Sequence, residues 1–229
     1  MQAGAGLKTR KKIKFKKRYW LLIDLAIVIF IIALFLYKPR CYDPPRAVND
    51  NQVSQYLTHV LYQDIYNGSQ RQEPFDLIVT QKGINDVIVR SEWPKQSDGI
   101  IFSAPAVLFV PDRIILMGTV VLKGVELVVT IVGNPILDEE GLLNLRVVKV
   151  KIGAMNITFL ARMMAERIYR QQLATTDVDI EDRQAQIAAS LLNDEPFEPV
   201  FEIDDKRVRV EEITIGREKL TIRMVPAYD

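Results

Sequence analysis

Cysteine and histidine are almost missing from the 229 residues, which contain one of each. The single cysteine, Cys41, cannot form a disulfide within the chain or supply a four-cysteine metal site. The single histidine, His59, has no second histidine or cysteine with which to share a metal, and it argues against Ser-His catalysis. The sequence also lacks a G-x-S-x-G motif and a glycine-rich phosphate loop. We therefore expect no catalytic residues, no metal, no cofactor and no enzymatic activity.

Acidic residues are absent from the first nineteen positions, which hold eight lysines or arginines. The rest of the chain has 22 basic and 29 acidic residues, so the formal net charge of +1 combines a basic tail with an acidic body. The tail contains too few aromatic residues to favour nucleic acid, and we expect anionic lipid as its partner instead. The apolar content of 48% is that of a chain able to bury a core, which excludes a fibrous or wholly disordered protein.

Residues 20–37 form a long apolar run, WLLIDLAIVIFIIALFLY, in which Asp24 carries the only charge. As a helix this run would be about 27 Å long, close to the thickness of the hydrocarbon core of a membrane. The basic residues directly before it keep the N-terminus in the cytoplasm, and no small-residue cleavage site follows it. The run predicts a single-pass transmembrane helix in the plasma membrane, with the C-terminal part of the chain outside the cytoplasm.

The apolar run divides the chain into four predicted parts. These are a basic cytoplasmic tail at 1–19, the transmembrane helix at 20–37, a proline-rich neck at 38–46 and one extracytoplasmic domain at 47–229. Pro39, Pro44 and Pro45 favour an extended neck, because each proline restricts its own φ and disfavours helix in the residue before it. We interpret Cys41, within the neck, as an ordinary juxtamembrane thiol.

The central part of the domain, from residue 100 to residue 152, is rich in Val, Ile and Leu and has turn signals about every ten residues, which predicts an antiparallel meander. Both phases are apolar over 114–122, so these strands are covered on both faces or line a cavity. The apolar phase changes near Val147 and Val148, which predicts a β-bulge and a strongly bent sheet. Other expected elements are helices at 49–68, after the Thr80 cap, after the Asn156 cap and at 177–193, and strands at 75–80, 197–203, 207–215 and 219–225.

The helix after Asn156 has an apolar face opposite Arg162, Glu166 and Arg170. We expect this amphipathic helix to lie inside the curve of the sheet. The predicted fold class is therefore α+β: an N-terminal transmembrane helix followed by a strongly curved antiparallel sheet wrapped around an amphipathic helix. The apolar positions of this helix are Phe159, Leu160, Met163, Met164 and Ile168.

The order of these elements, together with a pattern of aliphatic residues and glycines, is found at 75–80 and 83–85, 107–109 and 112–118, 121–124, 141–145 and 148–153. These segments resemble the YpmS-type family of membrane-anchored bacterial proteins. The family is similar to tubular lipid-binding (TULIP-like) domains, in which a curved sheet wraps a long helix and leaves an apolar groove. The resemblance implies a bacterial cell-envelope protein that holds or passes membrane lipid, and it supplies no catalytic residues.

Two functions follow as hypotheses. The first is a non-enzymatic, membrane-tethered protein with an apolar lipid groove, for which the candidate wall residues are Val107, Leu116, Val121, Val128, Phe159, Met163 and Met164. Each of them is also compatible with ordinary core packing. The second is a structural or assembly protein whose core is filled by its own side chains and whose surface docks an envelope protein partner. An apolar groove of several hundred Å³ would favour the first hypothesis.

Overall fold

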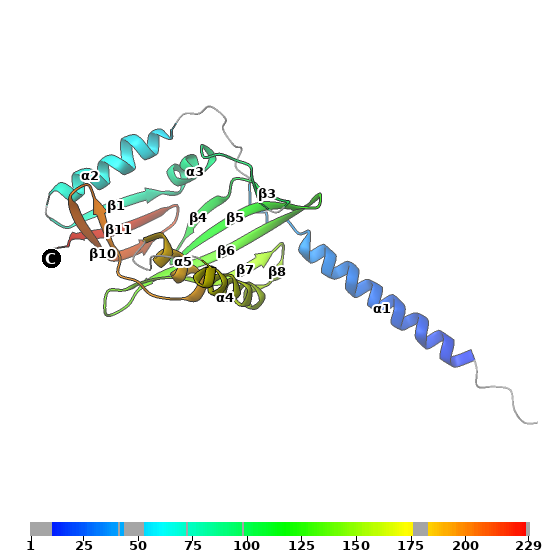
Figure 1. Ribbon diagram of the computed structural model, residues 1–229. Coiled ribbons are helices and arrows are strands. Elements are labelled where there is room, and N and C mark those ends of the chain that lie inside the picture. Colours follow the sequence, from blue (N-terminus) through cyan, green and yellow to red (C-terminus); the bar gives the residue numbers. More distant parts are fainter. Residues whose placement is uncertain are drawn as a thin grey trace, which may run out of the picture.

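A computed structural model describes residues 11–40, 42–43, 53–71, 73–97, 99–175 and 183–227, and for 11–18 and 168–175 it describes the backbone alone. Its described strands form two antiparallel sheets, and the sequence prediction of a mixed α+β fold is confirmed (Figure 1). Several predictions fall outside the described residues: those for most of the basic tail, for Cys41, Pro44 and Pro45, for the helix start near Asn49 and for the start of the helix expected at 177–193.

The smaller sheet has the strand order β1-β11-β10-β9. It joins a strand from the start of the domain to the last three strands of the chain, since Leu77 of β1 lies opposite Ile222 of β11. Its strands are β1 Phe75–Thr80, β9 Val200–Ile203, β10 Lys206–Ile215 and β11 Lys219–Pro226. Alternation in β10, the strand expected at 207–215, buries Val208 and Val210 and exposes Arg207 and Arg209.

The larger sheet has the order β2-β3-β5-β6-β7-β8, with β4 also paired to β5. The predicted meander forms the centre of this sheet. The predicted bulge is confirmed: Val132 lies opposite Lys149 and Gly133 opposite Val147, so Val148 is an extra residue in β7. Its strands are β2 Lys95–Ser97, β3 Ile100–Phe102, β4 Ala106–Val110, β5 Arg113–Leu122, β6 Val125–Leu137, β7 Leu143–Ile152 and β8 Met155–Asn156.

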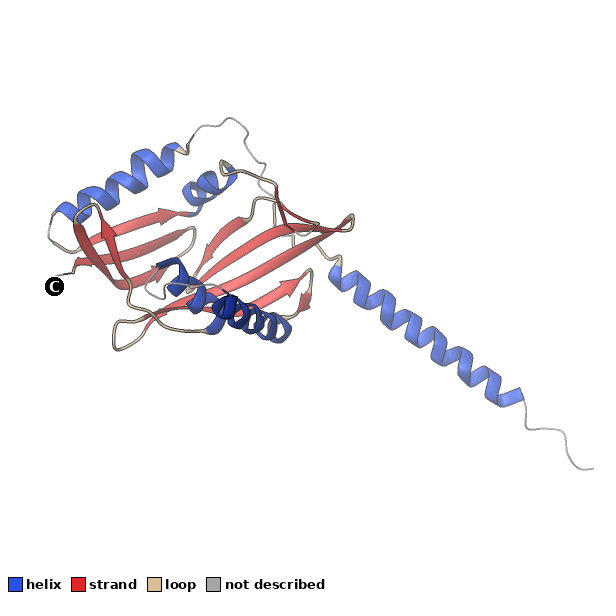
Figure 2. Ribbon diagram, in the orientation of Figure 1, coloured by secondary structure: helices blue, strands red, loops and turns tan. Residues whose placement is uncertain are grey.

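Helices lie beside both sheets (Figure 2). The first helix of the domain consists of η1 and α2, and it lies beside the smaller sheet together with α3. The Thr80 cap of α3 is confirmed, because the Thr80 hydroxyl accepts a hydrogen bond from the Gly83 N–H at 3.1 Å. The predicted cap by Asn156 also forms, since its side-chain oxygen accepts from the Thr158 N–H at 3.0 Å. The helices are α1 Lys11–Phe35, η1 Leu57–Leu61, α2 Tyr62–Gln70, α3 Gln81–Val89, α4 Thr158–Thr175 and α5 Arg183–Asn193.

The prediction of one strongly curved sheet wrapped around an amphipathic helix is wrong. The strands divide into two sheets, and neither sheet is strongly curled. The apolar face of the larger sheet packs instead against the smaller sheet and the first helix, where Val107 and Phe109 join Leu61 and Val210 in one core. Since this second layer already covers the face, α4 is left at the edge of β7, where its Arg162 donates to the Val147 carbonyl oxygen at 2.9 Å.

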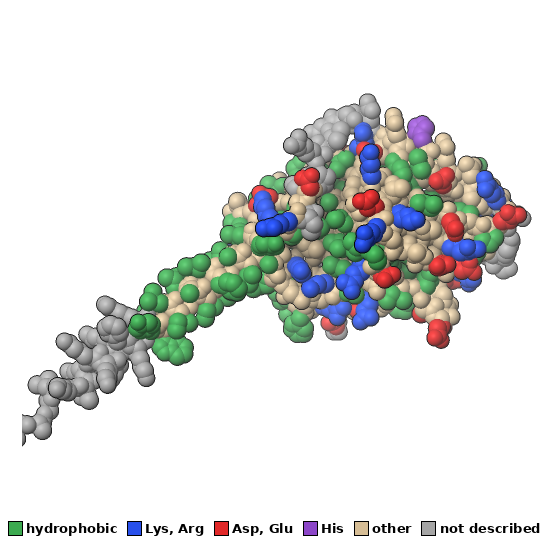
Figure 3. All heavy atoms as spheres, turned by 180° about the vertical axis from the view of Figure 1, so that it is seen from behind, with side chains coloured by type: hydrophobic (Ala, Val, Ile, Leu, Met, Phe, Trp, Pro, Cys, Tyr) green, Lys and Arg blue, Asp and Glu red, His purple; other side chains and the backbone are tan. Residues whose placement is uncertain are grey.

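The end of α1 is attached to the larger sheet. The Ala154 N–H donates to the Leu34 carbonyl oxygen at 2.8 Å, and Lys38 forms an ion pair with Glu126 at 2.8 Å. Gly153, at φ 58°, makes this contact possible, because a Cβ there would collide with carbonyl oxygens at the end of α1. Beyond this attachment α1 projects away from the body, covered with apolar side chains, whereas the body carries interspersed charges (Figure 3).

Candidate functional site

An apolar pocket of about 400 Å³ lies between the two sheets. The larger sheet and the smaller sheet each provide part of its wall, and Ile65 of α2 adds to it. Among the lining residues, Glu202 carries the only charge, and it is exposed. The lining consists of Ile65, Ile114, Pro135, Leu143, Leu145, Phe201, Glu202, Ile203, Val210, Ile213, Leu220, Ile222 and Met224.

The lengths of the strands explain where the pocket forms. The pairing of β5 with β6 ends at Ile114 and Gly133, but β6 continues to Leu137 beside β7. Pro135 is tolerated in this extension because a strand without a neighbour on one side does not need that N–H for a ladder. The two sheets therefore share a core around Val107 and Val208, and the pocket opens where β6 and β7 extend beyond the end of the pairing of β6 with β5.

A bulge in β10 shapes the opposite wall. Val210 lies opposite Met224 and Glu212 opposite Arg223, so Glu211 is an extra residue in β10. Because of the bulge, the next side chain after Val210 that faces inward is Ile213, and Glu211 and Glu212 are both exposed. As a result Val210 and Ile213 both line the pocket while the charged side chains remain on the outer face of the sheet.

The four predicted wall residues on strands do not meet in one cavity. Val107 is buried in the core and lies opposite Leu116 in the β4–β5 pair. Leu116 shares its face of β5 with the pocket residue Ile114, but Val121 lies at an odd position of the same strand and points to the other face. Val128 pairs with Thr119 and is 1% exposed on that other face. None of the four lines the apolar pocket.

The three predicted wall residues on α4 lie on the surface. Phe159 is 83% exposed, Met163 53% and Met164 54%, and none of them lines the pocket. Sequence periodicity identified their shared face correctly but could not show that the larger sheet would be covered by another layer.

The residues that line the apolar pocket were not among the predicted wall residues, although part of their signal was present in the sequence. Leu220, Ile222 and Met224 alternate with polar residues, which indicates a strand with one apolar face in need of a cover. That pattern did not reveal what covers the face. Ile65 and Leu145 belong to segments far away along the chain, so only the packing of the two sheets brings them to Ile222.

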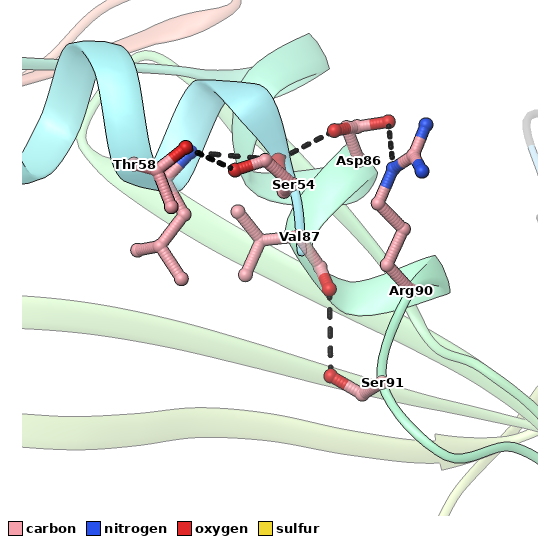
Figure 4. Close-up of polar contacts among 7 residues, drawn as sticks. Ser54, Thr58, Asp86, Val87, Arg90 and Ser91 are labelled. Atoms are coloured by element: carbon pink, nitrogen blue, oxygen red, sulfur yellow. Dashed lines mark hydrogen bonds and ion pairs between the residues drawn. The ribbon is translucent and has the colours of Figure 1, made fainter. Parts of the chain in front are cut away.

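A second hollow, of about 410 Å³, lies between the start of the first helix and α3 and has a mixed polar and apolar lining. Ser54, 2% exposed, donates a hydrogen bond of 2.5 Å to Asp86, which also pairs with Arg90 at 3.1 Å (Figure 4). The hydrogen bond from Ser54, with a smaller contribution from Arg90, holds the pKa of Asp86 below its ordinary value of 3.8, although desolvation acts in the opposite direction. These contacts fix the first helix to α3, and we assign them a structural role.

Three further features concern metal-binding side chains, the single histidine and membrane-spanning helices. In the parts of the chain that the structure describes, no group of three or more His, Cys, Asp or Glu side chains is arranged to hold a metal ion. His59 is exposed, and its ring nitrogen shares a hydrogen bond of 2.8 Å with Thr58. Among the same described residues, no helix is long and apolar enough to cross a membrane.

The fold and the pocket together define a two-sheet α+β domain with an apolar hollow between its layers. No protein-family model matches the chain, and no curated protein matches it.

Proposed function

We propose that this protein is a non-enzymatic, membrane-tethered protein of the bacterial cell envelope that binds or passes lipid through the apolar pocket between its two sheets. The observation that carries the proposal is the pocket itself, whose volume of about 400 Å³ is lined by aliphatic and aromatic side chains. Ligand pockets commonly measure about 300–1,000 Å³ and are mostly apolar. A pocket of this size and lining suits an acyl chain better than a polar substrate.

The binding energy in such a pocket comes from removing hydrocarbon from water. Each buried methylene contributes about 0.8 kcal/mol, and no titratable group is needed. The lining agrees with this, because Ile213, Leu220 and Ile222 present only hydrocarbon to the hollow. Glu202, exposed in the lining, is placed to remain in water while an apolar guest is bound.

The tether is the second part of the proposal. It is supported by the apolar run at 20–37 with its preceding basic residues, which predict a cytoplasmic N-terminus and an extracytoplasmic domain. It is also supported by the exposure of the described α1 side chains, such as Leu21 at 69% and Phe30 at 63%, which lie outside any protein core. The resemblance to the YpmS-type family and to TULIP-like domains points to the same membrane lipid partner.

A structural or assembly role, in which the surface docks an envelope protein partner, is the alternative. The exposed apolar residues of α4 favour it, because a contiguous apolar patch on a surface marks an interaction site. The two functions differ in what the pocket does, since docking through the surface does not require lipid between the sheets.

The test is native mass spectrometry of the full chain, purified in mild detergent, with identification of any lipid that remains bound. Ile213→Trp would fill the pocket, and Ile78→Trp is its matched control, because Ile78 is 49% exposed and lines no part of the pocket. We expect bound lipid on the unmodified chain and on the control, and its loss from Ile213→Trp. A denaturation curve checks that both variants fold, since overpacking costs about 1–3 kcal/mol.

Two outcomes would contradict the proposal. Equal lipid on all three chains would mean that the pocket is not the binding site. No lipid on any of them would leave the assembly role as the better explanation.

A further inference from the structure

Helix α4 leaves its apolar face uncovered. Its side chains at four neighbouring positions are exposed although they are large and hydrophobic, while the side chains of Thr158 and Arg162 form hydrogen bonds with β7. The polar side of the helix already contacts the sheet, and an exposed apolar face of this kind marks a site of contact with another surface. The four residues are Phe159 at 83%, Leu160 at 47%, Met163 at 53% and Met164 at 54% exposed.

The start of α4 lies close to the end of α1. The Ala154 N–H is bonded to the Leu34 carbonyl oxygen, and Thr158 follows only four residues later. Four residues of extended chain span at most about 14 Å, so Thr158, the first residue of α4, lies within that distance of Ala154. Figure 1 shows α4 beginning beside the end of α1, with α2 at the opposite end of the body.

The attachment of α1 to the body fixes this arrangement. Besides the Ala154 bond, Lys38 pairs with Glu126, and the Tyr42 hydroxyl shares a hydrogen bond of 2.9 Å with the buried Thr119. These contacts link the segment directly after α1 to β5 and β6. The end of α1 is therefore fixed relative to the sheet whose edge carries α4.

The hydrogen bonds of α4 orient its exposed face. The Thr158 hydroxyl accepts from the Val150 N–H at 2.9 Å, and Arg162 donates to the Val147 carbonyl oxygen at 2.9 Å. Both residues lie on one side of the helix, four positions apart. Phe159 and Met163 lie about 100° farther round the helix and Leu160 and Met164 about 200° farther, so the exposed apolar side chains turn away from that edge of the sheet. Arg162, Glu166 and Arg167 are exposed on the same helix, so its described charged side chains include two basic residues and one acidic residue.

We propose that the N-terminal half of α4 lies in the outer interface of the membrane, with Phe159, Leu160, Met163 and Met164 among the lipid headgroups and the first methylenes. This inference rests on the proposed tether and adds a second contact of the domain with the bilayer. An interfacial helix buries its apolar face roughly 5–10 Å deep, and basic residues beside that face attract anionic lipid. The body is then held at a fixed angle to the bilayer.

The experiment uses the full chain in vesicles of phosphatidylcholine and phosphatidylglycerol. The single cysteine is replaced by Cys41→Ser, and nitroxide labels are attached in separate variants at Met163→Cys and Phe159→Cys. The control is Tyr62→Cys, because Tyr62 is 64% exposed on α2 at the other end of the body. Electron paramagnetic resonance then measures the accessibility of each label to oxygen, which concentrates in lipid, and to a nickel chelate, which remains in water.

We expect the ratio of oxygen to nickel accessibility to be several-fold higher at Met163 and Phe159 than at Tyr62. Equal ratios at the three positions would overturn the proposal, because the face of α4 would then lie in water. Low accessibility to both reagents at Met163 would also overturn it, because a second copy or another protein would then cover the face. A chain that does not float with the vesicles would overturn the tether as well, whereas the lipid pocket has its own test in the Ile213→Trp variant.

Discussion

Helices α3 and α4 each close the free edge of a strand with side-chain hydrogen bonds. On α3, the Asn85 side chain accepts from the Val107 N–H and donates to the Val107 carbonyl oxygen, each at 2.7 Å. Gln81, one turn earlier, accepts from the Phe109 N–H at 2.8 Å. On α4, Thr158 and Arg162 bond in a similar way to the edge of β7.

The two helices differ in what their apolar residues do. Ile84 and Ile88 of α3 pack against the core, whereas Phe159 and Met163 of α4 are exposed. A few polar side chains are thus enough to close a strand edge, which otherwise invites pairing with another chain. The rest of such a helix is free either to fill the core or to serve another surface.

The largest expected effect concerns the polar contacts. Asn85→Asp would replace the amide donor by an acceptor facing the Val107 carbonyl oxygen, and we expect the free energy of unfolding to fall by about 3 kcal/mol. The matched change on α4 is Arg162→Gln, which at an exposed site should cost about 0.5–1 kcal/mol. Urea denaturation measures both, and equal losses would show that the two helices support the fold alike.

A smaller effect is expected from the apolar residues. Ile84→Ala removes part of a side chain that packs against the core, and it should lower the free energy of unfolding by about 2 kcal/mol. Met163→Ala truncates an exposed side chain and should change it by less than about 0.5 kcal/mol in detergent. A large loss for Met163→Ala would mean that α4 packs its apolar face within the protein.

The smallest effect concerns acid stability and involves α3 alone. Because the folded pKa of Asp86 is lowered from its ordinary value of 3.8, this carboxylate stabilises the fold above the unfolded pKa, and that contribution is lost as the pH falls through the folded value. Ser54→Ala removes the main cause and should raise the pKa of Asp86 toward its ordinary value. An NMR titration of the Asp86 carboxyl would check this, and an unchanged pKa would show that Arg90 is sufficient.

Local sequence patterns predicted the elements of this fold well. Thr80 and Asn156 were identified as caps, and the phase change at Val148 predicted a bulge that the pairing of β6 with β7 confirms. Each of these features depends on residues within a few positions of one another. The placement of α4 was wrong for the opposite reason, because its position depends on which layer covers the larger sheet.

The sequence by itself determined the apolar run, the basic tail, the strand periods and the apolar face of α4, since these follow from side-chain spacing along one segment. Tertiary structure decided that β1 joins β11 in a second sheet and that the pocket forms where β6 outruns β5. Pairing and packing between distant segments select these outcomes, and the alternation of residues within one strand is the same whichever partner covers it.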